Sequence, residues 1–422
     1  MAAMDLVRAL GKASISCAIV TGTWKPACYS RHVKKVIIQQ ALAIDGKLRA
    51  LSEFATAQAI KPVLFYEDDE NLFFISKHRA HLSTLFHLSI ADHNFILDLL
   101  DKARFLKLAK DFDLPVPASH VLKQSTMTEG PELAIDFPAI IKPVQRGREW
   151  NSVIGAKAFL ITNRDELQRA LPQLLRVGGD LIAQNLVEGP ESSIESYHVY
   201  VDQCFTIVGE FTGRKIRTLP TSYGVSTALM TTDQEDVAAC GREIVKKLKL
   251  TGVAKLDFKR GLDGRLYLLE VNPRFSLWHH LGAVAGVNLP ALVYADLTGA
   301  PRPPVSRARG GVRWFLPWAD FASARSSGTS IAAWLRFATS VAAKSSLAWD
   351  DPLPFLRGVL LPLVTNSQWR SQNLSKLRRS GLRRRIPGLS ATGGAMPTPP
   401  RPKPLDIGPA VGPVGLEQKP LR

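Results

Sequence analysis

The sequence predicts an α/β region followed by an α+β region, and then a basic tail without fixed structure. Three observations predict this class. Between residues 5 and 112, buried strand-like runs alternate with helical periodicity, which is typical of a parallel sheet. From residue 137 the apolar runs are joined by tight turns, which indicates mostly antiparallel strands. After residue 301 the composition shifts toward Arg, Pro and Gly.

Composition supports a folded protein of more than one domain. The chain has 422 residues, of which 45% are hydrophobic and 22% charged, as is ordinary for globular proteins. Four scattered cysteines, Cys17, Cys28, Cys204 and Cys240, exclude a disulfide scaffold and a Cys-based zinc site. No apolar run approaches the ~20 residues that span a bilayer. We therefore expect a soluble, cytoplasmic protein.

The net charge of +17 is unevenly distributed along the chain. Residues 1–300 hold 35 basic and 32 acidic side chains, whereas residues 301–422 hold 19 and 5. Because the main body is nearly neutral, a basic nucleic-acid groove through it is not expected. We predict no nucleic-acid partner.

The elements of the first region follow from periodicity and turn residues. We expect helices at Asp5–Leu10, Leu72–Leu88 and Asn94–Phe112, and buried strands at Ser14–Val20 and Pro62–Tyr66. Two further amphipathic segments, Val33–Gln40 and Leu51–Ala59, flank an expected turn at Asp45–Gly46.

The second region contains mostly strands. We expect strands at Phe137–Val144, Ala156–Ile161, Leu181–Val187, Glu195–Val201, Cys204–Phe211, Val253–Lys259 and Arg265–Val271. Helices are expected at Arg164–Leu175, Asp236–Lys249 and Ile331–Ala343. The turn Leu262-Asp263-Gly264 predicts that the last two strands form a hairpin.

A polar constellation lies on this last hairpin. Asp257 lies on its first strand, while Glu270 and Asn272 lie two residues apart on its second strand and so share one face. Mg²⁺ prefers such oxygen ligands and completes its octahedron with water and nucleotide phosphate. Because an unpaired buried carboxylate is costly, these residues predict a site for Mg²⁺ or Mn²⁺. Arg274 follows closely enough to reach a phosphate or a substrate carboxylate.

With these residues, the chain resembles the ATP-grasp superfamily over about residues 5–300, and specifically its carboxylate–amine ligase branch. LLEVNPRF and KLDF resemble the two metal-binding strands of the family. FPAIIKPV resembles its nucleotide-binding strand, LIAQNLVEGPE its hinge over the adenine, and LLDKARFLKLAKDFDLPVPAS the preceding helix. YSRH and YEDDENLFFIS resemble the sheet domain that precedes them. D-aspartate ligase-like enzymes are similar members.

The resemblance implies an ATP site. Lys102 and Lys142 would contact the nucleotide phosphates, Gln184 the adenine amino group, the Val187 backbone the ring edge, and Glu191 the ribose hydroxyls. A lone lysine such as Lys102 is more often a surface residue than a ligand. Lys142, between apolar residues of a strand, is harder to explain without a functional partner.

Three cationic side chains are candidates for stabilising negative charge in the transition state. Lys255 shares a strand face with Asp257, and Arg274 follows Asn272. Arg214 belongs to a GRK segment that the branch places near its active site; a solvated Arg-Lys pair is an equally good interpretation. His279 and His280 are expected to pack against aromatic rings rather than to bind metal.

The resemblance further implies an ATP- and Mg²⁺-dependent ligase. A carboxylate would attack the γ-phosphoryl group to give an acyl phosphate, and an amine would then displace phosphate, with release of ADP. The expected partners are a small-molecule carboxylate and an amine, for which an amino acid is a candidate. Two alternatives stay open: a carboligase that activates bicarbonate, and an ATP-binding protein without ligase activity.

The expected organisation has four parts: a Rossmann-like domain at 1–100, a two-lobed ATP-grasp domain at 101–300, an extension at 301–369 and a disordered tail at 370–422. A Rossmann-like domain normally opens with a strand. Only four residues precede the first helix, so we expect that strand to be missing and the true start to lie upstream. The tail has 11 basic and 2 acidic residues; it is either simply solvated or makes weak contact with an anionic membrane.

Overall fold

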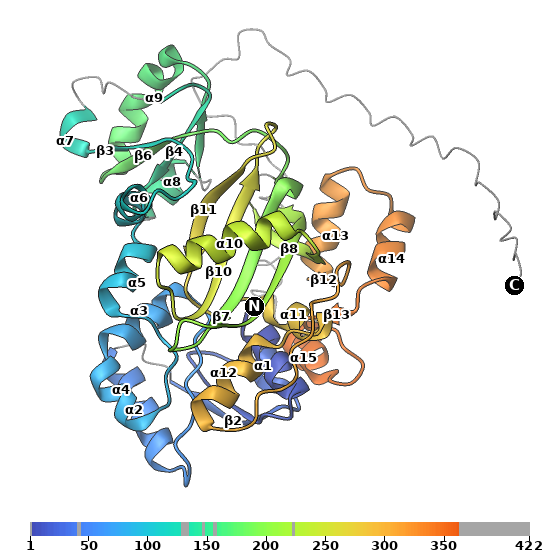
Figure 1. Ribbon diagram of the computed structural model, residues 1–422. Coiled ribbons are helices and arrows are strands. Elements are labelled where there is room, and N and C mark those ends of the chain that lie inside the picture. The colour runs from blue at the N-terminus through green and yellow to red at the C-terminus, as the bar shows by residue number, and fades with distance from the viewer. Residues whose placement is uncertain are drawn as a thin grey trace, which may run out of the picture. The chain divides into compact units, whose positions relative to one another are not determined.

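The computed structural model describes most of the chain before residue 363. The described residues are 2–39, 44–127, 135–145, 148–154, 158–221 and 224–362. The predictions made for the tail at 370–422 lie outside them. The described residues contain three sheets of two, four and seven strands (Figure 1).

The N-terminal part combines a small parallel sheet with five helices. Its strands β1 (Cys17–Thr21) and β2 (Val33–Ile38) pair in parallel. The helices are α1 (Ala2–Lys12), α2 (Ile44–Thr56), α3 (Asp69–Lys77), α4 (Arg79–Leu85) and α5 (His93–Leu100). A short 3₁₀ helix, η1, spans Pro26–Tyr29. Parallel pairing and α/β alternation are therefore confirmed for this part of the chain.

Two local predictions in this part are wrong. The predicted strand Pro62–Tyr66 makes only an isolated parallel bridge, between Val63 and His87. The predicted turn Asp45–Gly46 lies inside α2, where Asp45 is an acidic residue of the first turn. A carboxylate there interacts favourably with the positive end of the helix dipole, so the Asp-Gly pair does not have to mark a turn.

A four-stranded antiparallel sheet follows, in the order β3-β6-β4-β5. Its strands are β3 (Ser119–Leu122), β4 (Ala139–Pro143), β5 (Phe159–Ile161) and β6 (Leu181–Asn185). The helices are α6 (Lys102–Asp111), α7 (Gln124–Met127), α8 (Arg148–Val153) and α9 (Arg164–Val177). Leu167 and Leu174 of α9 belong to one buried cluster with Ile141 and Leu181, so α9 covers one face of this sheet.

The seven-stranded sheet has the order β11-β10-β7-β8-β9-β12-β13. Its strands are β7 (Ile194–Val201), β8 (Ile207–Leu219), β9 (Val225–Thr232), β10 (Gly252–Arg260), β11 (Leu266–Asn272), β12 (Arg313–Phe315) and β13 (Ala343–Lys344). Neighbouring strands are antiparallel except β12 and β13. The predicted hairpin of β10 and β11 is confirmed. Strands from both sides of residue 300 share this sheet.

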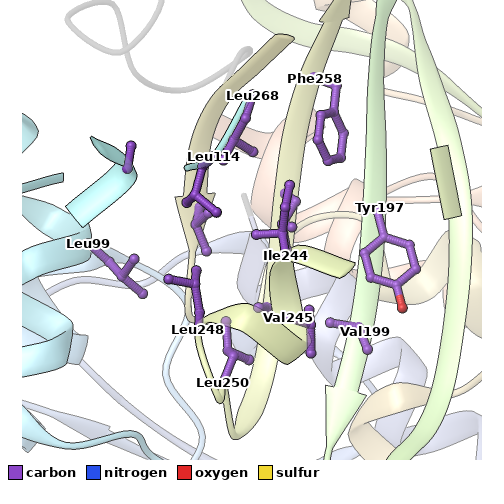
Figure 2. Close-up of a cluster of buried hydrophobic side chains, with 14 of the residues drawn as sticks. Leu99, Leu114, Tyr197, Val199, Ile244, Val245, Leu248, Leu250, Phe258 and Leu268 are labelled. Atoms are coloured by element: carbon purple, nitrogen blue, oxygen red, sulfur yellow. The ribbon is translucent and has the colours of Figure 1, made fainter. Parts of the chain in front are cut away.

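Helix α10 (Glu235–Lys247) covers one face of the large sheet, which we call the helix face. Figure 2 shows Tyr197, Val199 and Phe258 of this face beside Ile244 and Val245 of α10. All five side chains are buried. At about 25 cal/mol per Å² of apolar surface, such burial is the main force holding the helix on the strands.

The opposite face, which we call the polar face, changes character along its strands. Near Val253 it is covered by α11 (His279–Ala285) and α12 (Leu289–Thr298), and Trp278 packs there with Phe211. Further along β10 the side chains of this face are Lys255, Asp257 and Lys259, which alternation places on one side of the strand. The face therefore passes from apolar core to charged site within seven residues of β10.

The remaining elements belong to the C-terminal extension and one connection. They are α13 (Pro317–Ser326), α14 (Ile331–Thr339), α15 (Leu353–Phe355), η3 (Leu356–Leu360) and η2 (Glu191–Ser193). In the part of the chain described, no single helix is long and apolar enough to cross a membrane. Helices α11 and α12 are long and apolar enough only when they are taken together, and the chain bends by 92° between them.

Candidate active site

The carboxylates Asp257 and Glu270 face each other across the hairpin of β10 and β11. The register pairs Asp257 with Glu270 and Lys255 with Asn272. Side chains directly opposite in an antiparallel pair lie about 4.5–5.5 Å apart at Cβ, and two like charges there repel. A cation between the two carboxylates would therefore stabilise this pair.

Asp257 is buried and already has cationic and hydroxyl donors. Ser196 Oγ and Lys255 Nζ both donate to its carboxylate. Burial alone would raise the pKa of Asp257, but the Lys255 and Lys215 cations hold it well below its usual range. Burial would likewise lower the pKa of Lys255, yet Asp257 and Glu270 raise it above its ordinary value. Both groups are charged at neutral pH.

Glu270 and Asn272 present further oxygen atoms beside Asp257. The Glu270 side chain is 57% exposed, and its Oε1 lies 3.8 Å from Lys255 Nζ. Asn272 Nδ2 donates to the same Oε1 at 3.0 Å, and Arg274 Nη2 donates to Asn272 Oδ1 at 3.3 Å. Arg274 is itself held by Asp69 of α3. The structure thus brings all four of these predicted residues to one place.

The donor set fits a hard divalent cation that takes only part of its ligands from the protein. Across the described residues, no three His, Cys, Asp or Glu side chains come together closely enough to hold a metal on their own. Two carboxylates and one amide oxygen match the small protein share of ligands typical of Mg²⁺. The remaining ligands would come from phosphate and water.

Lys142 and Gln184 lie together on the four-stranded sheet. Gln184 is paired with Ile140, two residues before Lys142, so the two side chains are diagonal neighbours on the face away from α9. Lys142 Nζ donates to Gln184 Oε1 at 3.0 Å, and Gln184 Nε2 donates to Ser119 Oγ at 2.8 Å. An amide that holds a lysine and a serine in this way fixes the position of the ammonium group.

The charge of Lys142 is affected by groups from two other elements. Burial and the Lys102 cation lower the pKa of Lys142, the Glu270 carboxylate opposes them, and the resulting pKa is about 8. Electrostatic effects of this kind act over short distances. Lys142 of the four-stranded sheet and Glu270 of the seven-stranded sheet therefore lie close enough to interact electrostatically.

Lys102 lies at the start of α6, directly after its N-cap Asp101. Its Nζ donates to the backbone carbonyls of Pro143 at 2.7 Å and Val144 at 3.1 Å. These carbonyls follow Lys142 at the end of β4. Lys102 is thus anchored beside Lys142, and the interpretation as an unattached surface lysine is not supported.

Glu191 and Val187 lie on the connection that leaves β6. Glu191 opens η2, and Val187 is half-buried two residues beyond β6. Burial lowers the pKa of Lys259 on β10, and the Glu191 carboxylate opposes that effect. Glu191 therefore lies close to the charged end of the polar face. Sequence reasoning missed Lys259, although its position two residues after Asp257 was a visible signal.

The structure does not bring Arg214 to the polar face, which corrects the sequence prediction. Arg214 is paired with Glu195 and Met230, and its side chain lines a cavity on the helix face. Its neighbour Lys215 points the other way and lowers the pKa of Asp257. Alternation along β8 predicts that the two residues point to opposite faces, but the strand alone does not say which one reaches the carboxylates.

The buried histidines pack against aromatic rings, as predicted for His279. His279 lies edge-on to Phe275, with ring centroids 5.2 Å apart, and burial lowers its pKa to about 3. His198, which sequence reasoning did not single out, stacks on Phe211 at 4.4 Å and contacts Trp278 at 4.6 Å. These neutral rings form the apolar floor next to Lys255.

Comparison with known proteins agrees with this geometry. Residues 179–314 match the family model described as "ATP-grasp in the biosynthetic pathway with Ter operon". The chain is 26% identical to a D-aspartate ligase of Enterococcus faecium over 286 residues, which is 64% of this chain and 68% of that protein. It is 24% identical to a D-alanine–D-alanine ligase of Alkalilimnicola ehrlichii over 180 residues, 41% of this chain and 55% of that protein.

A solved structure shares the fold at low identity. An L-amino acid ligase from Bacillus licheniformis superposes with a TM-score of 0.53 and 14% identity, covering 69% of this chain and 70% of that one. At this identity the likeness concerns the fold alone. It extends well beyond the stretch matched by the family model.

Proposed function

We propose that the chain is an ATP-grasp ligase that joins a carboxylate to an amine and converts ATP to ADP and phosphate. The observation that supports this most directly is that the Glu270 carboxylate raises the pKa of Lys142, so the two groups interact electrostatically. A lysine suited to phosphate and a carboxylate suited to a metal thus interact although they belong to two different sheets. That is the arrangement that phosphoryl transfer between two lobes requires.

Residues of both sheets would position the nucleotide. Lys142 and Lys102 would bind phosphate oxygens, and Gln184 would orient Lys142 while its amide lies near the adenine. Glu191 would accept from the ribose hydroxyls. The Val187 backbone would contact the edge of the base. These assignments follow the family match residue by residue, and the observed hydrogen bonds are compatible with them.

Asp257, Glu270 and Asn272 would hold Mg²⁺ or Mn²⁺, which when bound makes the γ-phosphoryl group electrophilic. Lys255 and Lys215 would offset the negative charge that develops as a substrate carboxylate attacks that group. Arg274, fixed by Asp69, would hold a carboxylate or the transferring phosphoryl group. Arg214 has no role in this proposal because it points to the helix face.

The named relatives suggest the substrate class. By their names, a D-aspartate ligase and a D-alanine–D-alanine ligase each act on an amino acid. We infer that an amino acid supplies at least one partner here. An acyl phosphate would form first, and attack by the amine would then release phosphate.

We propose that the chain has three parts before residue 370. Residues 1–100 would form the Rossmann-like domain, 101–300 the ATP-grasp domain and 301–369 its extension. We further propose a cytoplasmic location for the enzyme, since its nucleotide is supplied there.

The experiment is a phosphate-release screen in which the purified full chain is given ATP, Mg²⁺, single amino acids and pairs of amino acids. We expect release of ADP and phosphate that requires both a carboxylate and an amine. Hydroxylamine should then trap a hydroxamate of the carboxylate substrate. Release of AMP would contradict the proposal because it implies adenylation, and turnover that needs only bicarbonate and an amine would support a carboligase instead.

A further inference from the structure

A cavity of ≈ 600 Å³ opens on the helix face of the large sheet, on the other side of the strands from the carboxylate pair. It is formed where β7, β8, β9 and β10 come together, with Glu195, Arg214, Asp233 and Arg260 in its wall. Its volume lies in the range of sites for small organic molecules. The ligase chemistry proposed above makes no use of it.

Two of the charged groups in the wall neutralise each other. Arg260 Nη2 lies 2.7 Å from Glu195 Oε2, and Arg260 Nη1 lies 2.7 Å from Asp236 Oδ2 at the start of α10. Burial raises the pKa of Glu195, and Arg260 opposes that effect. This buried pair has its partners within the protein and needs none from a ligand.

Arg214 lies directly opposite Glu195 across β7 and β8 and lowers its pKa, but Glu195 is already ion-paired with Arg260. Over the described ranges, the side chains of Arg214 and Asp233 make no hydrogen bond or ion pair, although both line this cavity. Arg214 is exposed toward it. The Asp233 carboxylate lies against Gly310, where a Cβ would come within 2.0 Å of its Oδ2. The missing side chain of Gly310 thus leaves room for this carboxylate.

Within the described residues, one cation and one anion in this polar cavity make no ion pair or hydrogen bond, because Glu195 opposite Arg214 is ion-paired with Arg260, and these two groups define the charge pattern of a ligand. We propose that this cavity binds a small zwitterion, an α-amino acid, whose carboxylate pairs with Arg214 and whose ammonium group pairs with Asp233. A guanidinium takes a carboxylate through two parallel hydrogen bonds. A polyanion such as a nucleotide would leave Asp233 opposed to like charge, so a neutral ligand with both charges fits better.

The site is separate from the proposed active site. Arg214 and Lys215 are consecutive on β8 and point to opposite faces, as do Glu195 and Ser196 on β7. The zwitterion site therefore makes a prediction that does not depend on ligase activity. It can be tested on the full chain in the absence of ATP and Mg²⁺.

The experiment is calorimetric titration of the full chain with L-glutamine and with glycine, and with acetate and methylamine as half-ligands. We expect at least one of the two zwitterions to bind saturably and both half-ligands to bind more weakly. Arg214→Ala and Asp233→Asn should each weaken binding at least tenfold. Arg214→Lys, which keeps the charge but not the two-pronged geometry, should restore part of it.

Two matched variants make the result decisive. Arg265→Ala removes another exposed arginine, from the turn between β10 and β11, and should leave binding unchanged. Lys215→Ala removes the adjacent cation on the polar face and should also leave binding unchanged. Binding that survives Arg214→Ala, that is lost in Lys215→Ala, or that is absent for both zwitterions at millimolar concentration would overturn the proposal. None of these outcomes bears on ATP turnover, which the phosphate-release screen tests.

Discussion

The two faces of the large sheet use the same strands for different purposes. On β10, Ala254, Leu256 and Phe258 point to the helix face and are buried in the cluster with α10. The intervening residues Lys255, Asp257 and Lys259 point to the polar face. Successive residues of β10 thus alternate between the hydrophobic core and the charged polar face. The apolar side fixes the backbone, and the fixed backbone sets the spacing of the charges on the other side.

This comparison shows why buried charges are tolerated here. Asp257 is as inaccessible as the core residues beside it, and an isolated carboxylate in such a place would be strongly unfavourable. It persists because Lys255, Ser196 and Lys215 compensate it from the same face. We therefore expect substitutions on the polar face to affect turnover, and substitutions on the helix face to affect stability.

The largest expected effect is on turnover. Glu270→Gln removes one of the two carboxylates while it keeps an acceptor for Asn272, so it should keep the fold and lower ATP turnover by about 1,000-fold. Phosphate release measures the loss, and circular dichroism checks the fold. Glu243→Gln on the exposed side of α10 is the matched control and should retain activity. Full activity in Glu270→Gln would remove the basis for the metal site.

The second effect is on stability. Phe258→Ala on the helix face creates a cavity under α10 and should lower the free energy of unfolding by about 3–5 kcal/mol. Urea unfolding measures it, and KM for ATP should stay unchanged in the folded protein. Leu262→Ala, at an exposed turn position, should shift stability by no more than about 0.5 kcal/mol. A large change in KM for Phe258→Ala would show that the two faces are not separable.

The third effect compares two cations on opposite faces. Lys215→Ala should lower kcat/KM about tenfold to a hundredfold, because it removes a charge directed at the carboxylate site. Arg242→Ala removes the partner of Glu210 on the helix face and should leave kcat/KM within about twofold. Steady-state phosphate release distinguishes the two variants. Equal losses would contradict the assignment of faces.

The smallest effect is on pH dependence. Burial lowers the pKa of Lys142 to about 8 in the folded protein, from an ordinary value of 10.5. Lys142 is therefore charged below about pH 8, and nucleotide affinity should fall several-fold as pH rises through that value. Lys142→Arg stays charged, so its affinity should be flat over the same range. Nucleotide titration by fluorescence at pH 7 and pH 9 measures the difference.

The lowered pKa of Lys142 also predicts that the free energy of unfolding rises with pH, whereas nucleotide affinity falls. Because the folded pKa of Lys142 is lower than the unfolded one, the unfolded chain binds more protons between about pH 8 and 10.5. The cost of burying the charged lysine is fully present below about pH 8 and disappears as pH rises toward 10.5. Lys142→Met should therefore be more stable than the unsubstituted protein at neutral pH, by urea unfolding, and lose this advantage at high pH.

Much of the site was predictable because its parts are local. Asp257, Glu270 and Asn272 lie on one short hairpin whose turn residues fix the pairing, so their common face follows from alternation alone. The apolar runs of β4, β6 and β7 predicted buried strands for the same reason. The coarse α/β and α+β class followed from the change of pattern near residue 137.

What the sequence did not determine depends on contacts between distant segments. The bond between Lys142 and Gln184 exists because β4 pairs with β6 across about forty residues of chain. The segment Pro62–Tyr66 has only a weak strand pattern. Among the described residues it makes a single bridge, between Val63 and His87. Such pairings are set by packing over the whole fold, since local preference is weak compared with burial.

Arg214 shows most clearly which features follow from the sequence and which depend on the tertiary structure. Alternation along the sequence determined that Arg214 and Lys215 point to opposite faces of β8. Only the tertiary structure decided that α10 and the cavity lie on the side of Arg214 and the carboxylates on the side of Lys215. The physical reason is that alternation fixes relative directions within a strand, whereas the identity of each face depends on what the rest of the chain packs against it.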